Sequence, residues 1–239
     1  DTPASAGSWE AARLAVGAVL TPVDELVAGR QKNIFAFVRP PGHHAERARA
    51  MGFCLFNNVA VAAEYAIQKH HLKKVLIVDY DVHHGNGTQH TFYDRPDVFY
   101  MSTHRYPFYP GTGAADEEGS GAGRGTTLNI PMSGGQGDEE LGKAFETKII
   151  TAAVDFAPDL VIVSAGFDAH RLDPLGGMEV TDAGFAGISQ LILDVAAKSC
   201  GGKALFVLEG GYSLEGLKES VREVLGVMIG QEGSLPGKV

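Results

Sequence analysis

Residues 75–87 read VLIVDYDVHHGNG, a run of strand-forming aliphatic side chains that stops abruptly at two acids and two histidines. A continuous apolar run of this kind is typical of a β-strand that is covered on both faces of its sheet. Similar short runs occur at residues 34–38, 98–102, 126–132, 160–165 and 204–209. We therefore expect a buried sheet built from these segments.

Segments with a helical pattern separate several of these runs, at residues 57–71, 139–156, 182–199 and 214–229. A first helical segment, residues 8–29, contains Thr21 and Pro22; a Thr cap with Pro at the first helical position predicts that a second helix restarts there. Strands that alternate with helices predict an α/β fold, with a doubly wound, mostly parallel sheet and helices on both faces. The length and the lack of a linker predict one domain over residues 1–239.

The composition argues against several function classes. Lys and Arg number 20 and Asp and Glu number 29, so the net charge of 20 − 29 = −9 argues against nucleic acid as a direct ligand. No apolar run reaches the roughly 18 residues of a membrane span. The first residues show no basic region followed by an apolar core, so we expect no secretory signal. Cys54 and Cys200 are too few for a disulfide framework, which favours a reducing cytoplasm.

Polar residues follow four of the expected strands. His43 and His44 end RPPGHH after the first run, and the acids and histidines of residues 79–84 follow the run at 75–78. Asp168 lies in GFDAH after the run at 160–165, and Tyr212 ends EGGY after the last run. Ligands of open parallel sheets bind beyond the carboxyl ends of the strands. We therefore expect His, Asp and Tyr side chains from separate strands to meet at one edge of the sheet.

Three of these residues form a candidate metal site. Asp81 and His83 are alternate residues, so in an extended segment they point to one side, and Asp168 is the best third ligand. Three protein ligands and an open position are typical of catalytic zinc, although iron, cobalt or manganese also suit two carboxylates and one imidazole. A solvated polar turn is the alternative; two such motifs at two strand ends favour the metal.

The paired histidines suit general acid–base catalysis, because imidazole titrates near neutral pH. Asp79 is a candidate to orient one of them and Asn86 is a candidate partner for the other. The alternative is that His43 and His44 are metal ligands or core residues. The remaining histidine of the motif, His84, is expected to have no catalytic role.

Tyr212 follows two glycines, and Gly210 and Gly211 permit close backbone approach to a bound substrate. A phenol placed there can donate a hydrogen bond to a developing oxyanion, whereas a surface turn is the alternative. The long Gly-rich loop at residues 103–125 lacks the spacing of a phosphate-binding loop and is expected to shape the site.

Six motifs, RPPGHHA, GFCLFNN, VDYDVHHGNGTQ, FYPGTG, SAGFDAHRLDPLGG and LEGGY, together resemble the zinc-dependent histone deacetylase family. The variety is similar to the class II enzymes and their bacterial deacetylase and amidohydrolase relatives, and the resemblance runs from about residue 8 to residue 229. It implies the arginase–deacetylase fold and hydrolysis of an acyl-lysine amide.

The resemblance also implies roles for individual residues. The implied zinc ligands are Asp81, His83 and Asp168. The implied catalytic residues are Tyr212 and the pair His43 and His44, with Asp79 supporting His43. Which histidine is the base and which the acid stays open, and we expect His44 to be the proton donor. The implied substrate tunnel is walled by Gly52, Phe53 and Tyr109. An implied structural potassium site uses Asp79, Ser102 and the backbone carbonyls of Asp81, His83 and Thr103.

Three positions depart from the common family pattern. Asn86 stands where class I members have Asp, so the second histidine lacks an anionic partner; Tyr109 stands where a tunnel Phe is usual. Leu175 stands where polyamine-selective relatives have a gatekeeping Glu. A Leu cannot attract a second ammonium group, which favours acetyl-lysine or another simple acyl-amide as the substrate.

Other functions remain open at this point. One is an acetylpolyamine or other small-amide amidohydrolase. An arginase-type binuclear manganese enzyme would need an Asp where His170 stands. The family's N-terminal stretch is expected to be missing, which would suit a truncated, non-catalytic acyl-lysine-binding scaffold. The sheet edge that this leaves uncovered would favour a homo-oligomer.

Overall fold

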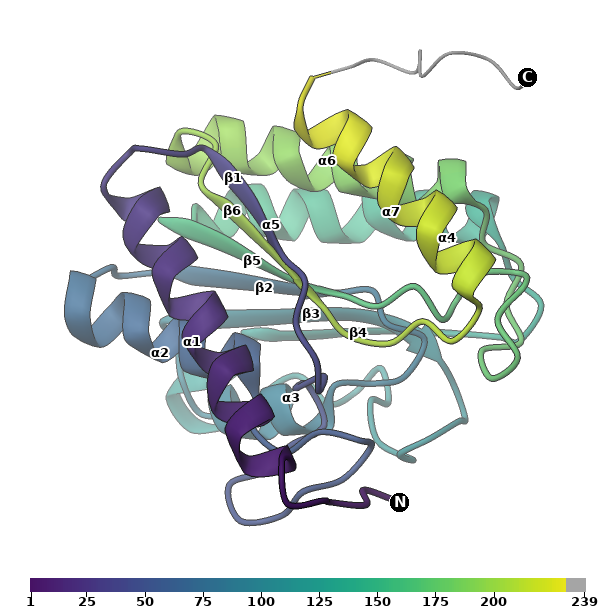
Figure 1. Ribbon diagram of the computed structural model, residues 1–239. Helices are drawn as coiled ribbons and strands as arrows, with labels where there is room; N and C mark the ends of the chain where they lie inside the picture. The colour runs from purple at the N-terminus through teal and green to yellow at the C-terminus, as the bar shows by residue number, and fades with distance from the viewer. Residues whose placement is uncertain (231–239) are drawn as a thin grey trace.

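The computed structural model describes residues 1–230, and its central feature is a parallel sheet of six strands (Figure 1). The strands are β1 (Asn33–Ala36), β2 (Val75–Asp79), β3 (Val98–Arg105), β4 (Thr127–Met132), β5 (Leu160–Ala165) and β6 (Ala204–Leu208). Their order across the sheet is β1-β6-β5-β2-β3-β4, and all neighbours are parallel. The predicted fold class is confirmed. The last residues of the predicted domain, 231–239, lie outside the described part of the chain.

Each central strand contributes side chains to two hydrophobic layers. In β2, Val75 and Ile77 lie in one layer while Leu76 and Val78 lie in the other. Side chains of a strand alternate between the faces, so a run that is apolar at every position needs a cover on both sides. The continuous apolar runs of the sequence are thus explained.

Helices provide both covers (Figure 1). One face carries α1 (Ser8–Val27), α2 (Asn58–His70) and α3 (Asn86–Phe92). The other face carries α4 (Asp138–Ala144), the π-helical turn η2 (Phe145–Ile149), α5 (Ile150–Phe156), α6 (Asp182–Cys200) and α7 (Leu214–Met228). In residues 1–230, no helix is both long and apolar enough to cross a membrane.

The predicted helix break at Thr21 and Pro22 is wrong, because α1 runs through Pro22 without interruption. Val19, Val23 and Leu26 are fully buried on one face of α1, so its apolar stripe continues across the proline. An interior proline costs about 3 kcal/mol, and the continuous packing of this stripe offsets that cost. The predicted helix at residues 139–156 is present as α4, η2 and α5 in succession. The short α3 was not predicted, since its Asn-Gly start is typical of a turn.

The chain reverses its direction across the sheet between β2 and β5. From β2 it proceeds through β3 to β4, then returns to the other side of β2 to form β5 and β6. Such a switch point opens a crevice at the carboxyl ends of the two strands. The loops that follow β2 and β5 therefore diverge and leave room for a site between them.

Candidate active site

The loops after β2 and β5 bring Asp81, His83 and Asp168 together. One ligand atom from each residue lies within 4.8 Å of the others. His83 Nδ1 lies 3.1 Å from Asp81 Oδ1 and 3.1 Å from Asp168 Oδ2. Both carboxylates are buried. The three residues predicted as metal ligands thus form one cluster at the switch point.

The electrostatics of this cluster favour a bound cation. Burial, followed by the negative charge of Asp81, raises the pKa of Asp168 to about 6. Burial would lower the pKa of His83, but its hydrogen bonds to Asp168 and Asp81 outweigh this effect and raise the pKa to about 10. Two buried carboxylates are unfavourable unless positive charge compensates them. An oxygen, oxygen and nitrogen donor set with this charge fits a divalent metal ion such as zinc.

Backbone groups hold the two carboxylates in place. Val82 N–H donates to Asp168 Oδ1 at 2.8 Å, and Gly210 N–H donates to Asp81 Oδ2 at 2.8 Å. Gly166 also abuts Asp81, and a Cβ at position 166 would lie 2.1 Å from Asp81 Oδ2. Gly210 was predicted to bind substrate, and this stays a prediction; in the structure its N–H donates to a metal-ligand candidate.

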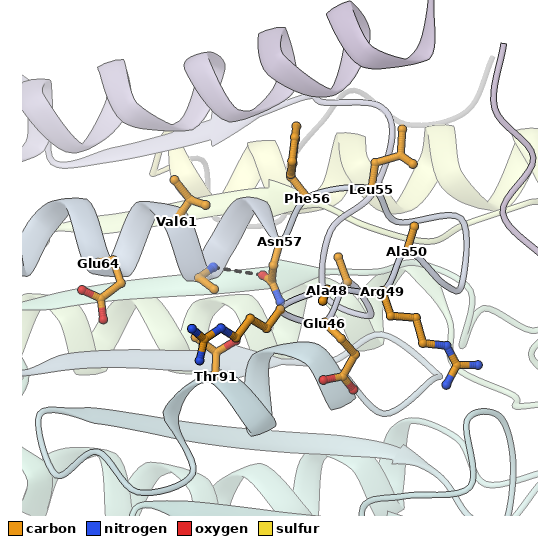
Figure 2. A pocket seen from close by; sticks show the side chains of 13 residues that line it. Glu46, Ala48, Arg49, Ala50, Leu55, Phe56, Asn57, Val61, Glu64 and Thr91 are labelled. Atoms are coloured by element: carbon orange, nitrogen blue, oxygen red, sulfur yellow. Dashed lines mark hydrogen bonds between the residues drawn. The ribbon is translucent and has the colours of Figure 1, made fainter.

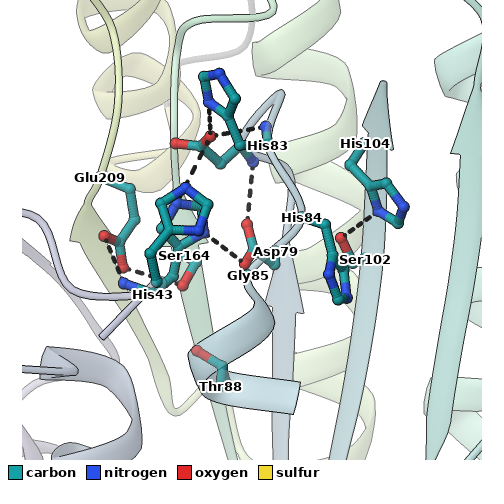
Figure 3. A network of polar contacts seen from close by, with 12 residues as sticks. His43, Asp79, His83, His84, Gly85, Thr88, Ser102, His104, Ser164 and Glu209 are labelled. Atoms are coloured by element: carbon teal, nitrogen blue, oxygen red, sulfur yellow. Dashed lines mark hydrogen bonds and ion pairs between the residues drawn. The ribbon is translucent and has the colours of Figure 1, made fainter. Parts of the chain in front are cut away.

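His43 lies beside this cluster, between two carboxylates (Figure 3). Its Nδ1 is 3.0 Å from Asp79 Oδ2 and its Nε2 is 3.8 Å from Asp81 Oδ1. Burial would lower the pKa of His43, but the charges of Asp81 and Asp79 outweigh it and hold the pKa well above 6.5. The arrangement therefore keeps the His43 imidazole protonated.

His44 has the opposite electrostatic character. Its Nδ1 lies 2.8 Å from Asn86 Oδ1, and its ring centroid lies 4.0 Å from that of His43. Burial, followed by the positive charge of His43, lowers the pKa of His44 well below 6.5. His44 is thus neutral, and a neutral imidazole can accept a proton.

Asp79 is fully buried and connects several parts of the site. Besides His43, its carboxylate accepts hydrogen bonds from Asp81 N–H at 3.1 Å and from the Tyr100 hydroxyl at 3.1 Å. Ser102, its neighbour in the sheet register, contacts His104 Nδ1 at 2.8 Å. Asp79 and Ser102 thus lie together below the metal cluster, and their potassium binding stays a prediction.

A cavity of about 260 Å³ opens in front of the metal cluster. Its walls include every side chain or glycine predicted for the tunnel or its gate, namely Gly52, Phe53, Tyr109 and Leu175, together with His44, His83, Tyr212, Asp1 and Phe108. Phe108 was not predicted; its ring stacks on that of His83 with a centroid distance of 5.3 Å and an interplanar angle of 13°. Phe108 and Tyr109 both belong to the loop at residues 103–125, so the prediction that this loop shapes the site agrees with its position.

Tyr212 lies on the same cavity wall, with its ring centroid 6.0 Å from that of Phe53. Burial, followed by the charges of Asp81 and Asp168, raises the pKa of the Tyr212 hydroxyl. The phenol therefore stays protonated at neutral pH and can donate a hydrogen bond into the cavity.

Two carboxylates that sequence reasoning missed support this site. Asp173 accepts hydrogen bonds from Tyr212 N–H at 2.6 Å and from Leu175 N–H at 2.9 Å. Glu209 accepts hydrogen bonds from Gly42 N–H at 2.6 Å and from the Ser164 hydroxyl at 3.1 Å. Burial raises the pKa of Glu209 to about 7. The sequence signal that could have indicated them was their position within the motifs LEGGY and RLDP. Their hydrogen-bond partners, however, are mostly backbone groups, which cannot be recognised from the residue types in the sequence.

His84 and His170 lie outside the cluster of Asp81, His83 and Asp168. His84 contacts Thr112 Oγ1 at 2.7 Å and Gln89 Oε1 at 2.9 Å, and its ring centroid lies 4.8 Å from that of His104 (Figure 3). Burial lowers the pKa of His84 to about 3, so its imidazole is neutral, and its lack of a catalytic role stays a prediction. The Nδ1 of His170 accepts a hydrogen bond from Leu172 N–H at 3.1 Å, and this residue supplies no carboxylate for a second metal ion.

Known proteins match the chain over most of its length. The family model described as "Histone deacetylase domain" matches residues 1–228. The chain is 51% identical over 242 residues to histone deacetylase 15 of Arabidopsis thaliana, in a match that covers 99% of this chain and 43% of that protein. It is 48% identical over 235 residues to the chloroplastic histone deacetylase 10 of Oryza sativa subsp. japonica, which covers 96% of this chain and 53% of that protein.

The crystal structure of the HDA15 HD domain matches with a TM-score of 0.92 and 51% identity, covering 96% of this chain and 67% of that chain. The two folds therefore correspond almost throughout the present chain. The chain spans about half the length of the curated relatives it matches, with 53%, 56% and 43% of three of them covered.

Proposed function

Because the chain belongs to the histone deacetylase family, we propose that it is a zinc-dependent deacylase that hydrolyses the amide of acetyl-lysine or a related acylated amine. One observation carries the proposal. The neutral His44, the phenol of Tyr212 and the metal-ligand candidate His83 line one largely aromatic cavity. The other two ligand candidates lie against His83, and the protonated His43 lies against His44. Those groups are what metal-assisted amide hydrolysis requires.

The cavity walls support a long, uncharged substrate stem. Phe53, Phe108 and Tyr109 present aromatic surface that suits the methylene chain of a lysine. Leu175 lines the cavity and is 47% exposed, which places an apolar residue at the mouth. A second ammonium group would find no counter-charge on Leu175, so we favour acyl-lysine over an acetylpolyamine.

Asp81, His83 and Asp168 would hold the zinc ion, which when bound supplies Lewis-acid polarisation of the acyl carbonyl and a lowered pKa for water. Neutral His44 takes a proton from the attacking water at Nε2 and later gives that proton to the leaving amine. Protonated His43, held by Asp79, stabilises the negative charge that develops beside it. The Tyr212 hydroxyl donates a hydrogen bond to the acyl oxygen as its charge grows.

The proposal also covers a second ion, the cellular compartment and the binding partners of the protein. Asp79, Ser102 and the backbone carbonyls of Asp81, His83 and Thr103 would hold a structural potassium ion. We propose a cytoplasmic protein, in keeping with its two free thiols, and no direct binding to nucleic acid, in keeping with the charge of −9. Pairing of two copies through the edge strand β1 is a prediction of the same kind.

The first test is hydrolysis of a fluorogenic acetyl-lysine peptide by the purified chain, with a metal analysis of the same sample. We expect turnover, one zinc per chain, loss of activity with a chelator and inhibition by a hydroxamate. Two equivalents of manganese would instead indicate an arginase-type site. Binding of the peptide without turnover would indicate a non-catalytic scaffold, and preference for acetylspermidine would indicate a polyamine amidohydrolase.

A further inference from the structure

Asn86 stands between His44 and a carboxylate that the proposed mechanism does not use. Asn86 Oδ1 lies 2.8 Å from His44 Nδ1, and Asn86 Nδ2 donates to Glu46 Oε1 at 2.5 Å. Asn86 is 2% exposed, so its amide has little access to water. The other contacts of Nδ2, with the His44 carbonyl at 3.4 Å and the Met51 sulfur at 3.5 Å, are longer and weaker.

Glu46 is itself held in position. His90, one helical turn after Asn86 on α3, contacts Glu46 Oε1 through Nδ1 at 2.8 Å. The backbone N–H of Glu46 donates to Arg49 O at 2.9 Å, which closes a tight turn. The carboxylate is 24% exposed and borders a second cavity of about 470 Å³, which Glu64 and Asn57 also line (Figure 2).

An amide can face its neighbours in two orientations that have the same shape and opposite hydrogen bonding. In the observed orientation Oδ1 faces His44, so the imidazole must carry its proton on Nδ1 and leaves Nε2 free to accept one. In the reversed orientation an N–H would face His44 Nδ1, and the imidazole would carry its proton on Nε2. Oδ1 would then face the Glu46 carboxylate, and two acceptors at that separation repel.

We propose that Glu46 is a positioning residue: it fixes the orientation of the Asn86 amide and thereby keeps the proton of neutral His44 on Nδ1, with Nε2 free to act as the base. This inference rests on the proposed function for its catalytic consequence, although the tautomer itself can be observed without turnover. An aspartate at position 86 would need no such help, since both of its oxygens are acceptors.

The direct test is Glu46→Gln in the zinc-loaded protein. A glutamine can donate or accept, so it no longer disfavours the reversed amide. Long-range 1H–15N spectra of the histidine rings should show His44 as the Nδ1–H tautomer in the parent and as a mixture or the Nε2–H tautomer in the variant. His44 is assigned by the signal that disappears in His44→Gln. We expect kcat on the acetyl-lysine peptide to fall about tenfold, the effect of one charge-assisted hydrogen bond, with KM unchanged.

The matched control is Glu64→Gln, which removes the same charge from the wall of the same cavity. Glu64 pairs with Arg95 and Gln68 and makes no hydrogen bond to Asn86. This control should leave both kcat and the His44 tautomer unchanged. Equal effects of Glu46→Gln and Glu64→Gln would overturn the proposal, because a general loss of cavity charge would then explain both.

The same Glu46→Gln change in an Asn86→Asp variant separates an effect on the orientation of the Asn86 amide from an effect on protein stability. In Asn86→Asp, the acid at position 86 holds the His44 proton on Nδ1 and repels Glu46, so adding Glu46→Gln should leave kcat unchanged or raise it. A tenfold loss in this background as well would refute the proposal. If the parent lacks deacylase activity but the tautomer changes as expected, the proposed function fails and the positioning role stands. If the parent is active but the His44 tautomer is the same in the parent and in Glu46→Gln, the positioning role fails and the proposed function stands.

Discussion

Replacement of Asp173 by Asn should separate the catalytic geometry from the stability of the fold. Asp173 Oδ2 accepts the backbone N–H groups of Tyr212 at 2.6 Å and Ser213 at 3.3 Å, while Oδ1 accepts those of Leu175 at 2.9 Å and Gly176 at 3.2 Å. The carboxylate is 8% exposed and thus joins the tyrosine loop to the gate loop away from water. In Asp173→Asn, one carboxylate oxygen is replaced by an amide NH2 group. This NH2 group faces two backbone N–H donors and cannot accept a hydrogen bond from either.

The structure gives a rough magnitude for this change. Two hydrogen bonds to a charged acceptor are lost, at about 1.5 kcal/mol each, so the free energy of unfolding should fall by about 3 kcal/mol. For a chain of this length such a loss lowers Tm by about 6–12 °C and leaves the protein folded at room temperature. Displacement of the Tyr212 hydroxyl by even about 1 Å should lower kcat about 100-fold. KM should rise as well, because Leu175 lines the cavity.

Asp159 provides the matched control at the opposite end of the sheet. Its Oδ2 accepts the backbone N–H groups of Lys73 at 2.8 Å and Lys74 at 3.0 Å. Asp159→Asn should therefore lower Tm as well, with kcat unchanged. The measurements are thermal unfolding, zinc content and steady-state kinetics on the acetyl-lysine peptide. If Asp173→Asn loses stability as Asp159→Asn does but keeps kcat within about twofold of the parent, the carboxylate does not position Tyr212.

Four further outcomes are expected. Tyr212→Phe should lower kcat about 10²–10³-fold with zinc content intact, and near-normal kinetics would exclude the phenol as the oxyanion donor. Gly166→Ala should abolish zinc binding, measured as metal per chain, because its Cβ would lie 2.1 Å from Asp81 Oδ2. Burial raises the pKa of Glu209 from 4.5 to about 7, so its contribution to stability is present below pH 4.5 and lost as the pH rises through 7. Glu209→Gln should thus gain about 3 kcal/mol over the parent in denaturant unfolding between pH 4.5 and about pH 8, and a constant difference would contradict this. Leu175→Glu should shift the ratio of kcat/KM values toward acetylspermidine, and an unchanged ratio would count against the gate.

The positions of Asp81, His83 and Asp168 could be predicted because a parallel sheet brings the carboxyl ends of its strands to one edge. That reasoning needs the strands and their direction, which continuous apolar runs indicate. The contacts of His43 with Asp79 and of His44 with Asn86 agree with the partners expected from the sequence.

The contributions of Asp173, Glu209 and Gly210 could not be predicted in the same way. Each makes its contact with or through a backbone N–H, and backbone groups are the same at every residue. Only the path of the folded chain decides which N–H reaches which carboxylate. Pro22 is a related case, since local propensity predicts a break and the packing of Val19 and Val23 against the sheet layer overrides it.

The contact between Asn86 and Glu46 changes the meaning of the neutral residue at position 86. An acid beside His44 would fix the tautomer and also attract positive charge onto the imidazole, which would raise its pKa. An amide that is itself fixed by a carboxylate still fixes the tautomer of His44. It raises the pKa of His44 less than an acid would, because the negative charge of Glu46 lies one hydrogen bond farther away. His44 is then oriented like the partner of an acid while burial and His43 keep it neutral. The effect of a neutral residue beside a catalytic histidine therefore depends also on the residue that it hydrogen-bonds on its other side. In this chain that residue is Glu46, which is half-buried and 40 positions away from Asn86 in the sequence.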